Sequence, residues 1–244
     1  MAPEPLDHET SPTADALKEE ARFGAWVLHR SGWRLLLVFL AVLLPLWGFA
    51  ELAAEIQSRG DLAFDVGILL HAQAIASPGM DRALLLISDL GYGYGVLPAE
   101  LVLVIVLAVK RRVRESVFAF FALGGSLLLN AAAKQSFARD RPSLWESIAP
   151  HSTYSFPSGH AMASATFIGV AVLLTWHTRW RWPVLVLGLG FVALVGYSRV
   201  YLGVHYPSDI LAGWAAASVW AAAVYLVVYR VTGRPWTPLP GQPE

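Results

Sequence analysis

The stretch SFPSGHAMASATFIGVAVLLTW, residues 155–176, joins a polar segment directly to a long apolar run. From Ala161 to Trp176 the run carries no charged residue, which is typical of a helix buried in protein or lipid. A run that only had to bury itself would gain nothing from the titratable ring of His160, or from Gly159, a poor helix former. The stretch therefore predicts a buried helix whose first turn belongs to a site.

Similar apolar runs recur along the 244-residue chain. Apolar residues make up 56% of the sequence and charged residues 15%, against roughly 25% charged in a soluble domain. We therefore expect an all-α, polytopic membrane protein with six transmembrane helices, in which flanking Trp, Tyr, Gly and Ser extend the shorter runs to the ~20 residues that cross a bilayer. The less favoured alternative is a large soluble helical bundle. The six runs are 35–52, 94–109, 117–133, 161–176, 183–197 and 210–228.

The remaining segments differ from these runs in composition. Residues 1–32 are expected to be a disordered cytoplasmic tail, because their first part is acidic and proline-containing and has no apolar period. Residues 231–244 have four prolines and predict a second loose cytoplasmic tail. Between the first two spans, residues 61–90 fit one or two amphipathic helices at the membrane surface. The six-span domain is thus expected over residues 33–230, with the first span as an uncleaved anchor.

The distribution of Lys and Arg predicts the orientation. The N-terminal tail, the loops at 110–114 and 177–181 and the C-terminal tail carry 12 of the 18 basic residues. By the positive-inside rule both termini face the cytoplasm. Arginine outnumbers lysine fifteen to three, which favours a GC-rich bacterial genome and hence a bacterial inner membrane. The six on the opposite side are Arg59, Arg82, Lys134, Arg139, Arg141 and Arg199.

Composition also bears on partners and cofactors. The chain has no cysteine, so it has no disulfide, no thiolate metal site and no cysteine nucleophile. Its formal net charge is zero, so no overall basic field favours binding to nucleic acid. The sequence does not indicate an oligomeric state.

Polar residues gather on the expected outer face, where they fit a phosphate site. Three cations, Lys134, Arg141 and Arg199, lie there against the charge bias. An arginine fork binds two phosphate oxygens at once, and lysine adds a point charge. Pro157 suits the first turn of a helix, and the amides that follow it are expected to point outward and bind an anion. These amides belong to Ser158, Gly159 and His160.

Two histidines divide the expected chemistry. Pro207 is expected to open the sixth helix, which places His205 just before it and Asp209 in its first turn. The Asp209 carboxylate can then hold one ring nitrogen of His205 and leave the other as a nucleophile. His160 can donate a proton to the leaving oxygen. Because cations and amides supply the electrostatic stabilisation, no metal ion or other cofactor is expected.

These residues resemble the three-part motif of the type 2 phosphatidic acid phosphatases. Six residues separate Lys134 from Arg141, PSGH occupies 157–160, five residues separate Arg199 from His205, and three more precede Asp209. The resemblance covers about the 75 residues from Lys134 to Asp209. It implies that His205 is the nucleophile, Asp209 its partner and His160 the general acid. It also implies that phosphate binds to Lys134, Arg141, Ser158, Gly159 and Arg199.

Other polar residues match no required position of the motif. Arg139 and Asp140 are interpreted as a solvated loop or a local pair, and Glu100 and Asn130 as polar groups within spans without a named partner. The GYGYG segment at 91–95 is interpreted as a flexible turn. Three further histidines are expected at the surface: His71, His151 and His177.

The expected function is metal-independent removal of phosphate from a membrane lipid phosphate or diphosphate, through a phosphohistidine intermediate on His205. Undecaprenyl diphosphate, phosphatidylglycerophosphate and phosphatidic acid are the candidate substrates, and the sequence does not choose among them. One alternative is a lipid phosphotransferase that uses the same phosphohistidine. A vanadate-dependent haloperoxidase shares these residues but is disfavoured by the expected spans, and a non-catalytic lipid-phosphate binder or transporter is also less favoured.

Overall fold

The computed structural model describes residues 32, 36, 39–59, 62–230 and 233–236. The chain divides into two units, residues 1–40 and 41–244, and the second contains helices α2 to α9. The expected N-terminal tail lies outside the described residues, apart from Gly32, as do residues 237–244 of the expected C-terminal tail. Within the described residues every regular element is helical and there is no strand, which confirms the all-α prediction.

The helices follow one another along the chain with short connections, except before α7. A π-helical turn, Phe39–Leu43, leads into α2, and the longest connection, between α6 and α7, holds part of the motif. The helices are α2 Leu44–Arg59, α3 Ala63–Ala74, α4 Pro78–Leu90, α5 Val96–Val109, α6 Val113–Phe137, α7 Gly159–Thr175, α8 Arg181–Tyr201 and α9 Pro207–Tyr229.

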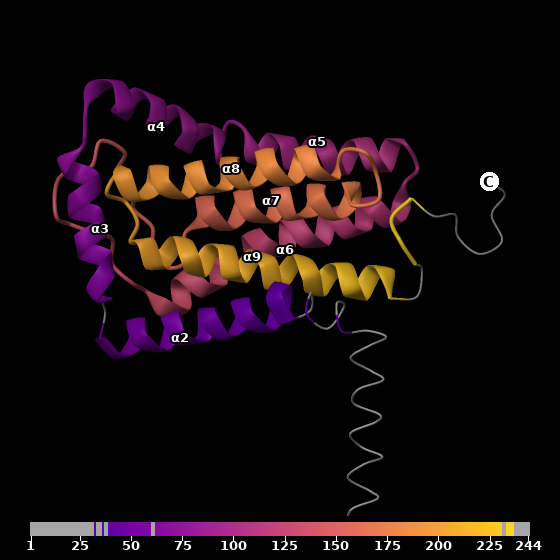
Figure 1. Ribbon diagram of the computed structural model, residues 1–244, viewed down its shortest axis with the longest axis horizontal. Helices are drawn as coiled ribbons and strands as arrows, with labels where there is room; N and C mark the ends of the chain where they lie inside the picture. Colours follow the sequence, from indigo (N-terminus) through magenta and orange to yellow (C-terminus); the bar gives the residue numbers. More distant parts are fainter. Residues whose placement is uncertain (1–31, 33–35, 37–38, 60–61, 231–232, 237–244) are drawn as a thin grey trace, which may run out of the picture. The chain divides into compact units, whose positions relative to one another are not determined.

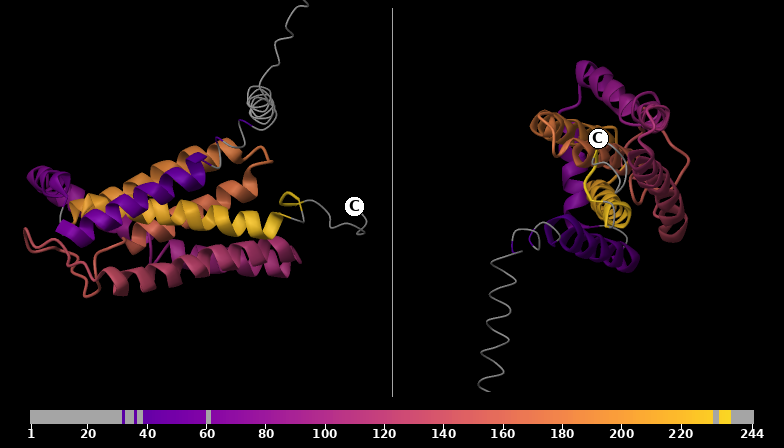
Figure 2. Two further views of the ribbon diagram at one scale, coloured as in Figure 1. Left: turned by 90° about the horizontal axis from the view of Figure 1, so that it is seen from below. Right: turned by 90° about the vertical axis from the view of Figure 1, so that its right-hand side faces the viewer.

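Helix α7 is the centre of the bundle. It packs against α5, α6, α8 and α9, and α6 to α9 run side by side (Figure 1 and Figure 2). Its buried side chains include Val170 and Leu174, which join Phe118 of α6 and Val224 of α9 in one apolar cluster. Because other helices surround it, α7 meets protein along much of its length. This explains why its sequence is apolar on all sides.

One glycine allows α9 to approach the start of α7. A Cβ atom on Gly213 would lie 2.9 Å from the carbonyl oxygen of Ser158 and 3.1 Å from the Cβ of Ala161. Both distances are shorter than ordinary van der Waals contact. The missing side chain therefore lets the two motif-bearing segments pack together.

All six predicted apolar runs form helices, but they differ in length. Four helical segments are long and apolar enough to cross a membrane: Phe39–Ser58, Val113–Phe137, Arg181–Tyr201 and Pro207–Tyr229. Helices α5 and α7 are apolar but have only 14 and 17 residues. The structure therefore supports an integral membrane protein with four candidate spans, and six spans stays a prediction.

The segment expected to form surface helices contains α3 and α4. Helix α3 runs across the ends of α8 and α9 and packs against both (Figure 1). It buries Asp65, Leu69 and Ala72. Helix α4 packs on α8 and buries Leu84 and Ser88. Each helix therefore has a buried side against the bundle, and α3 buries a carboxylate there, which a helix lying only on the membrane surface would not do.

Part of the expected C-terminal tail is packed against the bundle. The Trp236 backbone N–H donates to Glu115 Oε1 at 2.7 Å, and its indole N–H donates to the Leu174 carbonyl at 2.6 Å. Pro235 is buried. The described residues 233–236 are thus held against α6 and α7, whereas a loose tail was expected from the proline content.

Candidate active site

A cavity of about 320 Å³ opens where the predicted motif residues meet. The end of α6, the connection to α7, the first turn of α7, the end of α8 and the loop before α9 all contribute to it. Of the eight predicted site residues, Asp209 and Ser158 lie outside the lining. The lining residues are Tyr92, Leu127, Asn130, Ala131, Lys134, Arg141, His151, Thr153, Gly159, His160, Arg199 and His205.

His205 is buried between α8 and α9 and is oriented from both sides. Its Nδ1 lies 3.2 Å from Oδ2 of Asp209, in the first turn of α9. Its Nε2 lies 3.2 Å from Nη1 of Arg141. Since a guanidinium only donates hydrogen bonds, this geometry assigns the proton to Nδ1 and a lone pair to Nε2. Arg141, the partner of Nε2, also lines the cavity, whereas Asp209, the partner of Nδ1, does not.

Burial lowers the pKa of His205 well below its usual value. The positive charges of Arg141, Arg199 and Lys134 lower this pKa further, because they disfavour a second cation. His205 therefore stays neutral at physiological pH. A neutral imidazole with one nitrogen held by a carboxylate is the form that can act as a nucleophile.

Two of the predicted phosphate-binding cations are held by backbone carbonyls. Arg141 donates to the carbonyls of Thr153 at 2.6 Å and Val204 at 2.7 Å, and Lys134 donates to the carbonyl of Tyr154. These bonds fix both charges at the cavity wall before any ligand binds. Such preorganisation lowers the reorganisation needed when negative charge develops.

Arg199 has donors that the protein leaves unused. Its side chain is 1% exposed, and Nη1 donates to the hydroxyl of Ser88 in α4. Nε and Nη2 are buried and have no protein partner among the described residues. A buried guanidinium with unpaired N–H groups is strongly unfavourable. Because Arg199 lines the cavity, an anion bound there can satisfy these groups.

The PSGH segment differs in detail from the prediction. Helix α7 begins at Gly159, so Ser158 is its N-cap and Pro157 precedes the cap, where a first-turn position was expected. The Ser158 amide donates to the Asp209 carbonyl at 3.1 Å, so the expectation that it points outward without a partner is wrong. The amides of Gly159 and His160 have no protein acceptor in the part of the chain that the structure describes. Two amides at a helix N-terminus remain for an anion.

His160 lies in the cavity between two aromatic rings. It stacks on Tyr92, with ring centroids 4.7 Å apart, and meets the edge of His151 at 5.9 Å. His151 is exposed, as expected, but it also lines the cavity. Partial desolvation at the cavity, together with the positive charges of Arg199, Arg141 and Lys134, lowers the pKa of His151 to about 4. Sequence reasoning missed Tyr92 and His151 because neither belongs to the motif.

Arg139 was interpreted as a solvated residue or part of a local pair, and the structure shows that this is wrong. It is 7% exposed, and its Nη1 lies 2.7 Å from Asp209 Oδ1 while Nη2 lies 3.0 Å from Asp65 Oδ2. Both partners are at least 70 residues away in sequence. No local pattern could have indicated this arrangement. Asp140 is exposed, as expected for a solvated loop.

Two polar residues within helices have different environments. Asn130 of α6 is buried, and its Nδ2 donates to the carbonyl of Pro157 at 3.1 Å. It therefore braces the segment before α7. Glu100 of α5 is also buried and borders an apolar groove between α5 and α6. His71 and His177 are exposed, as expected.

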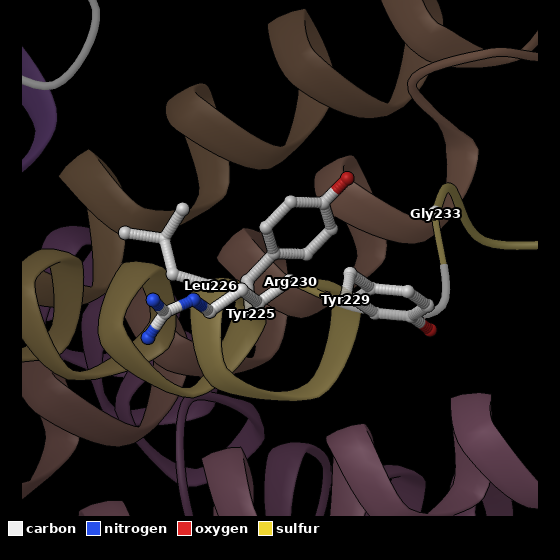
Figure 3. A pocket seen from close by; sticks show the side chains of 5 residues that line it. All are labelled: Tyr225, Leu226, Tyr229, Arg230 and Gly233. Atoms are coloured by element: carbon white, nitrogen blue, oxygen red, sulfur yellow. The ribbon is translucent and has the colours of Figure 1, made fainter.

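A second hollow, of about 350 Å³, carries none of the predicted site residues (Figure 3). It lies at the end of α9, and its side chains project from the last turns of that helix (Figure 3). Its side chains are those of two tyrosines, one leucine and one arginine. It therefore has no histidine comparable to His205 of the first cavity. The lining residues are Tyr225, Leu226, Tyr229, Arg230 and Gly233.

The chemistry of the first cavity is that of an anion site beside an oriented nucleophile. Three cations and two helix-start amides can hold a tetrahedral oxyanion, and His205 and His160 line the same cavity. Phosphoryl transfer needs mainly such positioning and charge stabilisation.

Comparisons with known proteins agree with this site. A family model described as the PAP2 superfamily matches residues 115–232. The chain is 31% identical over 193 residues to an undecaprenyl-diphosphatase of Sulfolobus acidocaldarius, a match that covers 76% of this chain and 85% of the relative. It is 30% identical over 172 residues to phosphatidylglycerophosphatase B of Bacillus subtilis, with 68% and 84% covered.

A solved structure extends the similarity to the fold. The transmembrane PAP2 type phosphatidylglycerolphosphate phosphatase from Bacillus subtilis superposes with a TM-score of 0.70 at 26% identity. The match covers 78% of this chain and 97% of that one. The chain therefore belongs to the PAP2 superfamily and is an integral membrane phosphatase.

Proposed function

We propose that this protein removes phosphate from a membrane lipid phosphate or diphosphate through a phosphohistidine on His205. The observation that carries the proposal is the pair of unsatisfied, buried donors of Arg199, a residue that lines the same cavity as His205. Lys134, Arg141 and the amide of Gly159 complete the proposed anion-binding site. Ser158 contributes indirectly, because as the N-cap of α7 it holds the first turn that carries Gly159.

The reaction has two steps. In the first, Nε2 of His205 attacks phosphorus, an N–P bond forms, and the bond from phosphorus to the leaving oxygen breaks. His160 gives that oxygen its proton, and Asp209 stabilises the positive charge that develops on His205. In the second step water attacks phosphorus with His160 as base, which releases phosphate and restores neutral His205. No step requires a metal ion or other cofactor.

The substrates proposed are undecaprenyl diphosphate, phosphatidylglycerophosphate and phosphatidic acid. The names of the two relatives support the first two. All three place a phosphate or diphosphate at the membrane surface with the hydrocarbon in the bilayer. We propose six spans in a bacterial inner membrane, with both termini in the cytoplasm and the site on the opposite face. The chain's proposed partners are thus the lipid substrate and the bilayer.

The test is phosphate release in detergent with EDTA, measured on these three lipids. Folded wild-type protein is expected to release phosphate from at least one lipid, and His205→Ala is expected to abolish release. Failure to act on any lipid would remove the proposed hydrolysis. Product that appears only when an acceptor alcohol is added would point to a phosphotransferase.

The intermediate gives a second, independent test. Rapid quenching of wild-type enzyme with a ³²P-labelled substrate should leave acid-labile, base-stable label on His205. His205→Ala should carry none. Release that persists in His205→Ala would show that another residue is the nucleophile.

A further inference from the structure

Asp65 of α3 is a fully buried carboxylate that reaches the site from outside the motif. Its Oδ1 accepts the backbone N–H of Ser208 at 2.9 Å, and its Oδ2 accepts the Ser208 hydroxyl at 2.5 Å. Oδ2 also meets Nη2 of Arg139 at 3.0 Å. Asp65 therefore binds the first turn of α9, which carries Asp209, and the arginine that contacts Asp209.

Arg139 connects the two carboxylates. Its Nη1 donates to Asp209 Oδ1 at 2.7 Å and to the Ser208 hydroxyl at 2.8 Å, and its guanidinium lies 4.0 Å from the centre of the Tyr206 ring. With Nη1 and Nη2 on different carboxylates, its orientation is fixed. A single cation is thus shared by Asp65 and Asp209.

The two oxygens of Asp209 consequently have separate tasks. Oδ1 faces Arg139, whereas Oδ2 accepts the Tyr206 backbone N–H at 2.9 Å, the Ser155 hydroxyl, and Nδ1–H of His205 at 3.2 Å. Rotation of the carboxylate would break bonds on both sides. The contact with His205 is therefore held by groups that do not touch the cavity.

We propose that Asp65 and Arg139 form a positioning pair that orients the Asp209 carboxylate toward His205 and balances its charge. The inference rests on the proposed role of His205 as nucleophile. Neither residue touches substrate. Asp65 acts through Arg139 and Ser208, and Arg139 acts through Asp209. The segment between α2 and α4 would thus contribute to catalysis although it carries no motif residue.

Charge balance makes the two residues act in opposite directions. The negative charge of Asp65 offsets part of the positive charge that Arg139 presents to Asp209. Without Asp65, Arg139 holds Asp209 more strongly, so Asp209 is a weaker partner for His205 and the ring binds a proton less readily. Without Arg139, the full charge of Asp209 acts on His205, and the ring binds a proton more readily.

The other charges around His205 are common to every variant and come from several elements. Their effect on the acid limb is the same in every variant and drops out of the comparison. The same holds for the second ionisation of a phosphate monoester near pH 6. These groups are Lys134 of α6, Arg141 and His151 of the connection to α7, His160 of α7 and Arg199 of α8.

The test compares kcat, KM and the pH profile of phosphate release for Asp65→Asn and Arg139→Gln. Each is expected to lower kcat by about tenfold to a hundredfold, the range found when outer partners of a metal-bound histidine are removed, with KM changed little. The acid limb of kcat/KM should move to lower pH in Asp65→Asn and to higher pH in Arg139→Gln. A purely structural role would not produce opposite shifts.

The double variant Asp65→Asn/Arg139→Gln keeps the test informative if a single variant fails to fold. Removing both members of a buried ion pair is tolerated better than removing one. The charges cancel, so its acid limb should return to the wild-type position, while kcat stays reduced because Oδ1 of Asp209 has lost its charged donor. The matched control is Asp81→Asn of α4, whose carboxylate accepts from Tyr201 at 2.7 Å outside the cavity. It should leave kcat and the pH profile unchanged.

Specific results would overturn the pair's role. Wild-type kcat and pH profile in folded Asp65→Asn, shifts in the same direction for both single variants, or wild-type kinetics in the double variant would each do so. These outcomes require an active wild-type enzyme. If the wild type releases no phosphate from any lipid, the proposed function fails instead, and the two failures are thereby distinguished.

Discussion

At the scale of single residues, the two histidines are distinguished by what holds their rings. His205 is bonded at Nδ1 by Asp209 and at Nε2 by Arg141, whereas His160 is held only by ring contacts with Tyr92 and His151 among the described side chains. A nucleophile must be oriented in one tautomer, whereas a general acid must exchange its proton in each turnover. The structure thus supports different roles for the two rings.

The proposed role of His160 as general acid predicts a dependence of the rate on the leaving group. His160→Ala should lower kcat/KM, which covers the steps up to departure of the leaving group, by about 10²- to 10⁴-fold on a lipid phosphate, whose alkoxide needs a proton as it leaves. The loss should be much smaller with p-nitrophenyl phosphate, whose phenolate leaves without one. His151→Ala, at the same cavity wall, is the control and should affect both substrates similarly. Equal losses for His160→Ala on both substrates would argue against an acid.

The lowered pKa of His205 predicts how activity responds to acid. The proposed nucleophile must be neutral, and because the pKa of His205 is lowered, its neutral form persists below pH 6.5. Arg141 is the charge that contributes most to this lowering after burial. Arg141→Gln should therefore raise the pKa of His205 and move the acid limb of kcat/KM to higher pH. Arg82→Gln, an arginine of α4 that does not line the cavity, should not move it. A limb unmoved by Arg141→Gln would show that His205 is not the titrating group.

At the scale of elements, the close contact between α7 and α9 predicts contrasting effects of two glycine substitutions. Gly213→Ala places a methyl group 2.9 Å from the Ser158 carbonyl, and such overpacking typically destabilises by about 1–3 kcal/mol. Gly190→Ala in α8 meets nothing within 4 Å and should be neutral or stabilising, by up to about 1 kcal/mol. Thermal unfolding in detergent and phosphate release measure both effects. Equal melting temperatures for the two variants would contradict the packing argument.

The sequence predicted elements better than it predicted their partners. Each apolar run became a helix because the lack of charge over many residues is a local property. The motif residues converged because fixed spacings place them at helix ends. The burial of Asp65 could not be predicted, since one carboxylate in the pattern AFDVGILLHAQA is equally consistent with a solvated helix face. Its partners, Arg139 and Ser208, lie 74 and 143 residues away, and only the path of α3 across α8 and α9 brings them together.

At the scale of the whole molecule, the length of helix α7 bears on how the bundle crosses the membrane. It has 17 residues, fewer than the ~20 of a typical span. However, α7 packs against α5, α6, α8 and α9. A helix enclosed by other helices does not need to match the bilayer thickness with its own apolar surface. Its polar N-terminus can therefore lie below the membrane surface in a cavity that protein lines.

The chain contains no cysteine, so single cysteines report topology without background. Ser152→Cys before α7 and His177→Cys after α7 both replace exposed residues. If α7 spans the membrane and the termini are cytoplasmic, an impermeant maleimide added to bacterial spheroplasts should label Ser152→Cys. His177→Cys should be labelled only after permeabilisation. The reverse pattern would invert the orientation, and labelling of both from outside would show that α7 does not cross. The expected pattern would place the phosphate site on the outer face, where a lipid phosphate in that leaflet can reach it directly.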